Sequence, residues 1–163
     1  MDCCVNKQVR LEDWMPVIRE SLAAGQSVVF SPRGTSMLPM LRQGVDRVEL
    51  SPLPEKLQKY DLPLYQRENG TYVLHRIVKV GETYTCIGDN QFQFERGLER
   101  RQMIAVVTAF ERDGKRIGVD DPAYRFYCRI WAVSRPVRHL WRGGVYRIKR
   151  MIGRCLGWAE KHP

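Results

Sequence analysis

The chain has 163 residues, 44% of them hydrophobic, which fits one globular domain able to bury a core without disulfides. Its five cysteines form neither a metal-ligand spacing nor an even set for pairing, which indicates a reducing, cytoplasmic compartment and no zinc site. The formal charge is +9, but no signal-peptide core and no apolar run of about eighteen residues accompanies it, so the sequence predicts no membrane span.

Residues 11–24 are predicted to form an amphipathic helix, because their apolar side chains recur at steps of three and four. Proline is tolerated only in the first turn, so Pro16 places the expected start near Asp13. We expect Trp14 and Met15 to contact the core, and the helix to pack on the sheet that carries the next motif.

A sharp bend is predicted at residues 32–40, directly after an apolar, strand-like run at 27–30. Gly34 can adopt backbone angles closed to other residues, and Pro39 fixes its own φ. The hydroxyl of Ser36 is thus presented by a rigid bend, as a nucleophile would be. Taken alone, the run is more typical of a surface turn than of a nucleophile.

Strands follow. Residues 45–50 alternate apolar and polar side chains, and residues 61–65 and 71–80 flank a turn signal at 68–70, which predicts a hairpin. His75 lies on the second arm among apolar neighbours, where its imidazole would be partly desolvated. A neutral imidazole is the usual base that activates a serine hydroxyl.

A third motif, Gly88-Asp89-Asn90, ends the next strand at a turn. Together with Gly34-Thr35-Ser36-Met37-Leu38-Pro39 and Leu74-His75-Arg76-Ile77, it resembles the ordered boxes of the signal peptidase I family. Histidine at position 75, where the common bacterial type has lysine, resembles the archaeal and endoplasmic-reticulum type. The similarity spans roughly residues 28–107.

The resemblance implies that Ser36 is the nucleophile, His75 the general base and Asp89 the acidic partner that fixes the tautomer of the imidazole. Gly-Asp-Asn is also ordinary turn chemistry. Glu95 and Asp46 therefore remain open as alternative partners, because sequence distance does not assign a carboxylate to an imidazole.

The backbone N–H of Ser36 is the natural donor to a developing oxyanion. The family often adds a hydroxyl two residues before the nucleophile, where this chain has Gly34, so Thr35 or another backbone N–H would substitute. We assign Gly34, Thr35, Met37 and Pro39 to the oxyanion and substrate-positioning region. No metal or organic cofactor is implied. The substrate would be an extended peptide or preprotein paired with a strand edge, with small residues before the cut.

The C-terminal region begins after a strand at residues 102–110 and a second hairpin that ends near 119. Residues 1–134 form the predicted catalytic domain, and residues 135–163 a basic amphipathic helix with eight basic residues and one acidic residue. Such a helix either lies on an anionic membrane or packs on the body. Its contact residues would be Arg138, Trp141, Arg142, Arg147, Lys149 and Arg150. No nucleic-acid motif accompanies the charge, so a nucleic-acid partner is not expected.

The resemblance implies a mostly β (α+β) domain of coiled sheets, of the signal peptidase and repressor-protease type. The predicted activity is that of a serine endopeptidase cleaving a signal- or leader-type peptide, in the cytoplasm or at the membrane surface. The alternative is a module of the same fold that binds an extended peptide without turnover, which the missing hydroxyl at Gly34 favours.

Overall fold

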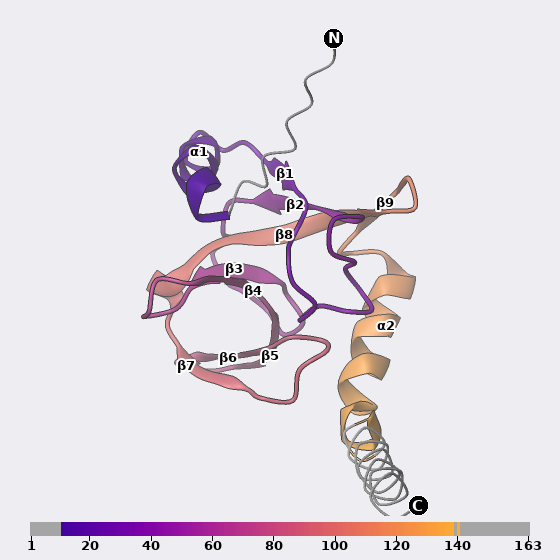
Figure 1. Ribbon diagram of the computed structural model, residues 1–163. Helices are drawn as coiled ribbons and strands as arrows, with labels where there is room; N and C mark the ends of the chain where they lie inside the picture. The colour runs from indigo at the N-terminus through magenta and orange to yellow at the C-terminus, as the bar shows by residue number, and fades with distance from the viewer. Residues whose placement is uncertain (1–10, 139, 141–163) are drawn as a thin grey trace, which may run out of the picture. The chain divides into compact units, whose positions relative to one another are not determined.

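The computed structural model describes residues 11–138 and 140 (Figure 1). The chain divides into two compact units, with the division after Arg125. The described residues form a mixed α+β fold in which antiparallel strands build two sheets. The predicted class, an α+β fold rich in strands, is confirmed at this level. No helix in the described part of the chain is long and apolar enough to cross a membrane.

The helices and strands follow one another closely along the chain. The helices are α1 (Leu11–Ala23), α2 (Pro122–Val133) and the short 3-10 helix η1 (Arg100–Gln102). The strands are β1 (Val28–Phe30), β2 (Arg47–Ser51), β3 (Pro63–Gln66), β4 (Tyr72–Leu74), β5 (Arg76–Val80), β6 (Tyr84–Ile87), β7 (Glu95–Leu98), β8 (Met103–Arg112) and β9 (Lys115–Gly118).

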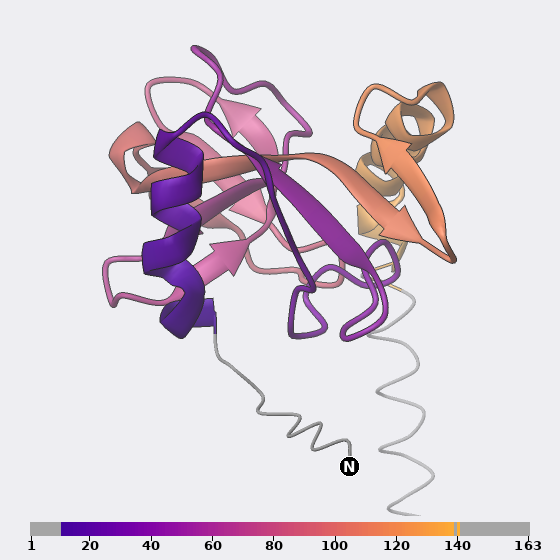
Figure 2. The ribbon, with the colours of Figure 1, turned by 90° about the horizontal axis from the view of Figure 1, so that it is seen from above.

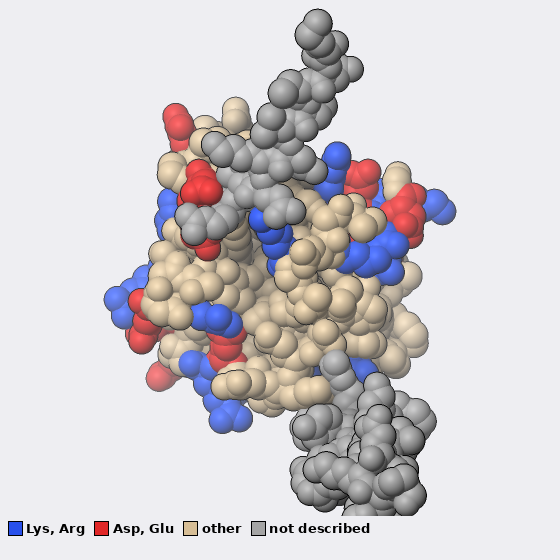
Figure 3. All heavy atoms as spheres, in the orientation of Figure 1, with Lys and Arg blue, Asp and Glu red and all other residues tan. Residues whose placement is uncertain are grey.

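The larger sheet has the order β1-β2-β8-β3-β4, with β9 also paired to β8, and the smaller sheet has the order β5-β6-β7. Every pairing is antiparallel. On the face seen in Figure 3, basic and acidic side chains of the described residues are interspersed.

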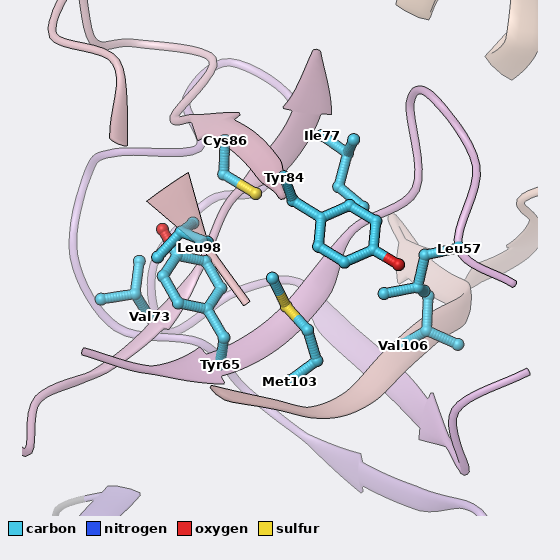
Figure 4. Packing of buried hydrophobic residues seen from close by; sticks show 9 residues of the cluster. All are labelled: Leu57, Tyr65, Val73, Ile77, Tyr84, Cys86, Leu98, Met103 and Val106. Carbon is cyan, nitrogen blue, oxygen red and sulfur yellow. The ribbon is translucent and has the colours of Figure 1, made fainter. Parts of the chain in front are cut away.

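The two sheets share a hydrophobic cluster, drawn in Figure 4. Its buried members come from both sheets and one loop: Leu57, Tyr65, Val73, Ile77, Tyr84, Cys86, Leu98, Met103 and Val106. Tyr65 and Ile77 are completely buried and come from different sheets. Packing of this cluster therefore fixes β3 and β4 against β5 and β6, and the site described below lies at that junction.

The N-terminal helix is present, but two details of the prediction were wrong. α1 begins at Leu11, so Pro16 lies inside it rather than in its first turn. Pro16 is on the exposed side of the helix, where water can satisfy the carbonyl that lacks a backbone donor. Met15 is buried as expected, whereas Trp14 is 52% exposed. α1 packs beside β1, the strand that leads to Ser36 (Figures 1 and 2).

The strand predicted at 71–80 is two strands in different sheets. β4 ends at Leu74 and pairs with β3, β5 begins at Arg76 and pairs with β6, and His75 stands between them. The apolar alternation runs through both strands, so it gives no sign that the chain changes sheets. Helix α2 was also not predicted, although Phe126, Ile130 and Val133 recur at helical spacing within it.

Candidate functional site

Ser36 lies in the loop between β1 and β2, as the bend predicted. Gly34 has φ +91, a conformation that strains any residue with a Cβ, and its N–H donates to Gln43 Oε1 at 3.0 Å. Met37 is buried beneath the bend, and the Leu38–Pro39 peptide bond is cis. The hydrogen bond from Gly34 to Gln43 and the buried side chain of Met37 hold the bend in this conformation.

An ion pair with a buried carboxylate stabilises the C-terminal part of this loop. Arg42 donates from Nε and Nη2 to Asp46 Oδ1 at 3.0 and 2.7 Å, and Asp46 is fully buried. Arg112 donates to the carbonyl oxygens of Pro39 and Met40. Burial raises the pKa of Asp46, but the hydrogen bonds from Arg42 outweigh it and leave that pKa below its usual range. Asp46 thus anchors the loop through Arg42.

His75 is 2% exposed, between the two sheets. Its Nδ1 lies 3.0 Å from Glu95 Oε1 and 3.3 Å from the Tyr65 hydroxyl oxygen. Its Nε2 faces Gly88, because a Cβ on Gly88 would lie 3.1 Å from Nε2 and 2.6 Å from the carbonyl oxygen of Ser36. One nitrogen of the ring is thus turned to a carboxylate, and the other toward Gly88, which also lies against the carbonyl oxygen of Ser36.

Glu95, the first residue of β7, is the carboxylate that contacts the imidazole. Arg67 donates to it from Nε at 2.9 Å and from Nη2 at 2.5 Å, and the Tyr65 hydroxyl also hydrogen-bonds to it. Burial raises the pKa of Glu95, but these hydrogen bonds outweigh it, so the pKa lies below its usual range. Burial raises the pKa of Tyr65, which remains a neutral donor.

The same burial lowers the pKa of His75, and the charge of Glu95 opposes that shift in part. The imidazole is therefore neutral at neutral pH, which is the form that can accept a proton. An anionic Glu95 at Nδ1 favours the tautomer with the proton on Nδ1, leaving the lone pair on Nε2.

Asp89 has a different partner from the one that the resemblance implied. Arg76 donates to both of its oxygens, from Nε at 2.8 Å and from Nη2 at 2.7 Å, and both side chains are buried. Arg76 also donates to the Tyr124 hydroxyl at 2.9 Å. The forked geometry of a guanidinium matches a carboxylate, so this pair occupies Asp89 while Glu95 takes the contact with the imidazole.

The turn at 88–90 nevertheless contacts the Ser36 loop. Asn90 N–H donates to the carbonyl oxygen of Ser36 at 2.8 Å, and Asn90 Nδ2 donates to the carbonyl of Thr35 at 3.0 Å. The Arg76–Asp89 pair holds the turn that makes these bonds. Asp89 therefore supports the position of Ser36.

A surface pocket of about 250 Å³ opens at this junction. Ser36 and His75 both line it, with Gly34 and Met37 from the bend and strand β4 along one side. Thr35 and Pro39 are exposed on the same bend. The loop of Ser36, the crossover at His75 and the edge strand β4 thus meet at one opening.

Three supporting residues were not identified from the sequence, namely Tyr65, Arg67 and Arg76. Arg76 belongs to one of the motifs that resemble the signal peptidase I family. The sequence around an isolated arginine does not show which carboxylate it pairs with. Of the predicted helix residues in the C-terminal region, Arg138 is described, whereas Trp141, Arg142, Arg147, Lys149 and Arg150 lie outside the described residues. In the described part of the chain, no group of three or more His, Cys, Asp or Glu side chains could hold a metal ion.

Comparisons of the chain with protein-family models, with curated proteins and with solved structures found no match.

Proposed function

We propose that the protein is a serine endopeptidase resembling signal peptidase I of the histidine type, with coiled sheets of that fold type. The observation that carries the proposal is that Ser36 and His75 line one pocket, while Nδ1 of His75 contacts Glu95 at 3.0 Å. A buried imidazole that has one nitrogen on a carboxylate and shares a pocket with a serine suits acyl transfer better than a structural role.

In the proposed reaction, Ser36 Oγ attacks the carbonyl carbon of the scissile peptide bond as His75 Nε2 takes the hydroxyl proton. The tetrahedral intermediate collapses, the C–N bond breaks, and His75 gives the proton to the leaving amine. Water then adds to the acyl-enzyme by the same proton path and releases the carboxylic acid. Glu95 stabilises the imidazolium formed in each step, and Arg67 and Tyr65 hold Glu95 in place.

Substrate would bind in extended form along β4, the edge strand of the larger sheet, because β4 borders the pocket. An edge strand offers unpaired backbone groups to a peptide strand, and the pocket then selects a side chain near the cut. The backbone N–H of Ser36 is the proposed oxyanion donor. The substrate class is a signal- or leader-type peptide with small residues before the cut.

The test compares the wild-type protein with Ser36→Ala on a library of peptides derived from a proteome, with new termini identified by mass spectrometry. We expect a set of cuts with a common sequence in the wild type and none with Ser36→Ala, both proteins having the same circular dichroism spectrum. Identical cuts with both proteins would reject Ser36 as the nucleophile.

The second candidate function is peptide binding without turnover, which Gly34 favours because it provides no hydroxyl at the position where the family often has one. Peptides retained by both proteins, with no new termini in either, would establish that function and reject the peptidase.

A further inference from the structure

We propose that one face of α2 from Phe126 onward, together with the described residues 134–138 and 140 that follow it, binds the surface of an anionic lipid bilayer. This inference is independent of the peptidase proposal, because it concerns a different surface and makes no use of Ser36 or His75.

The face is an apolar stripe, defined by five side chains that are each at least half exposed. They are Phe126 (65%), Ile130 (51%), Val133 (78%), Val137 (67%) and Leu140 (75%). On an ideal helix these positions fall within an arc of about 80° along a length of about 21 Å. Backbone bonds from Ser134 to Ile130 and from Arg138 to Ser134 carry the helical geometry past the end of α2. Five large apolar side chains on one face are more than scattered surface residues would give.

The other side of the segment has contacts of its own. The rings of Tyr127 and Trp131 stack with centroids 5.5 Å apart, and the Arg138 guanidinium lies 3.4 Å above the Trp131 ring. Tyr127 and Trp131 are half-buried, in contrast to the stripe. The segment is thus amphipathic, with its aromatic and cationic contacts on one side and the apolar stripe on the other.

The positive charge of the C-terminal region indicates which partner binds the stripe. Residues 122–163 contain ten basic residues and one acidic residue, whereas residues 1–121 contain seventeen of each. Arg125 and Arg129 are exposed and, on an ideal helix, lie along one border of the stripe. A second copy would bring the same positive charges together, which disfavours self-association. An anionic bilayer attracts these cations and accepts apolar side chains at the level of its headgroups.

The experiment is flotation of the full chain with vesicles of phosphatidylcholine containing about 30 mol % phosphatidylglycerol, against phosphatidylcholine alone, at about 0.05 M salt. We expect the protein to float with the anionic vesicles only, and to be released at about 0.5 M salt because screening weakens the attraction. Failure to float with anionic vesicles would overturn the proposal.

The matched variants remove two valines each. Val133→Ser with Val137→Ser should lower the partition coefficient about tenfold, since each loses an apolar contact with the bilayer. Val29→Ser with Val45→Ser, at positions 59% and 64% exposed on the body, should leave it unchanged. Valine and serine have similar helix propensities, and thermal unfolding checks that both proteins fold. Equal flotation of the two double variants would overturn the role of the stripe.

Two further measurements keep the outcomes distinct. Arg125→Gln with Arg129→Gln tests the same face without changing its apolar residues, and it should weaken flotation; undiminished flotation would count against the proposed docking face. Sedimentation velocity without lipid tests for a second copy, and a dimer dissolved by the valine variant of the stripe would overturn the membrane proposal. Ser36→Ala should float like the wild type, so loss of peptidase activity and loss of flotation are separable.

Discussion

Replacing Gly88 by alanine is expected to damage the site without unfolding the protein. A Cβ at this position would lie 2.6 Å from the carbonyl oxygen of Ser36 and 3.1 Å from His75 Nε2. A Cβ atom essentially never lies within 3.0 Å of a heavy atom to which it is not bonded through the chain. The Ser36 segment must therefore move by roughly half an ångström, since the interior is too closely packed to absorb the methyl group elsewhere.

The size of the effect follows from that displacement. Misplacing a reacting group by 1 Å costs about 100-fold in rate, so half that movement should lower kcat about tenfold. KM should change little, because β4 and most of the pocket lining are untouched. Overpacking by one methyl group should also lower the free energy of unfolding by about 1–3 kcal/mol.

The assay is steady-state hydrolysis of a quenched fluorescent peptide that carries the sequence cut in the library experiment. Gly81→Ala is the matched control, because its added Cβ would meet only the carbonyl oxygen of Thr83 at an ordinary 3.7 Å. The control should keep the wild-type kcat. A Gly88→Ala protein with wild-type kcat would refute the reasoning, because it would mean that the positions of Ser36 and His75 are unimportant.

Three further outcomes are expected. Glu95→Gln should lower kcat by about 10²- to 10⁴-fold, and, because the charge of Glu95 raises the pKa of His75, should move the acid limb of kcat/KM to lower pH; an unmoved limb in the pH–rate profile would count against the contact. Asp89→Asn should cost about 3–5 kcal/mol in urea unfolding, since it leaves the buried Arg76 uncompensated by that carboxylate, and a loss below about 1 kcal/mol would contradict the buried pair. Gly34→Ser introduces a hydroxyl at a position with φ +91, so we expect a loss of about 1–2 kcal/mol by thermal unfolding; unchanged stability would show that the loop relaxes.

The wild-type pH profile tests the environment of His75 by itself. Burial lowers the pKa of His75, so the acid limb of kcat/KM should lie below the ordinary value of 6.5. Because the folded pKa is below the unfolded one, the contribution of neutral His75 to stability is complete above 6.5 and is lost as the pH falls toward the folded pKa. A limb above 6.5 would place the imidazole in water or would assign the base to another group.

Local patterns predicted the parts of the site that depend on neighbours in the chain. Gly34 and Pro39 indicated the bend at Ser36, and the alternation around His75 indicated a buried imidazole. Both features are present. The bend follows from glycine torsions, which are a local property, whereas His75 is buried because the chain passes between the two sheets there, with every residue from 73 to 77 buried.

Local sequence patterns could not predict the contacts between distant segments of the chain. Asp89 and Glu95 are close together in the sequence. Only the packing of the two sheets determines that Glu95 contacts His75 and that Asp89 pairs with Arg76. The choice also depends on Arg67, which comes from the turn after β3. Sequence spacing carries no information on these contacts. It could identify the candidate carboxylates for the imidazole but could not show which of them contacts it.

The change of sheet at His75 makes the position of the proposed general base depend on both layers at once. If the small sheet of β5, β6 and β7 separated from the larger one, Glu95 would lose Arg67 and the Ser36 loop would lose its hydrogen bonds from Asn90. Heating should then abolish hydrolysis before the larger sheet exchanges its amide hydrogens, with activity returning on cooling. Enzymatic activity would in that case report the docking of two layers rather than the integrity of the whole fold.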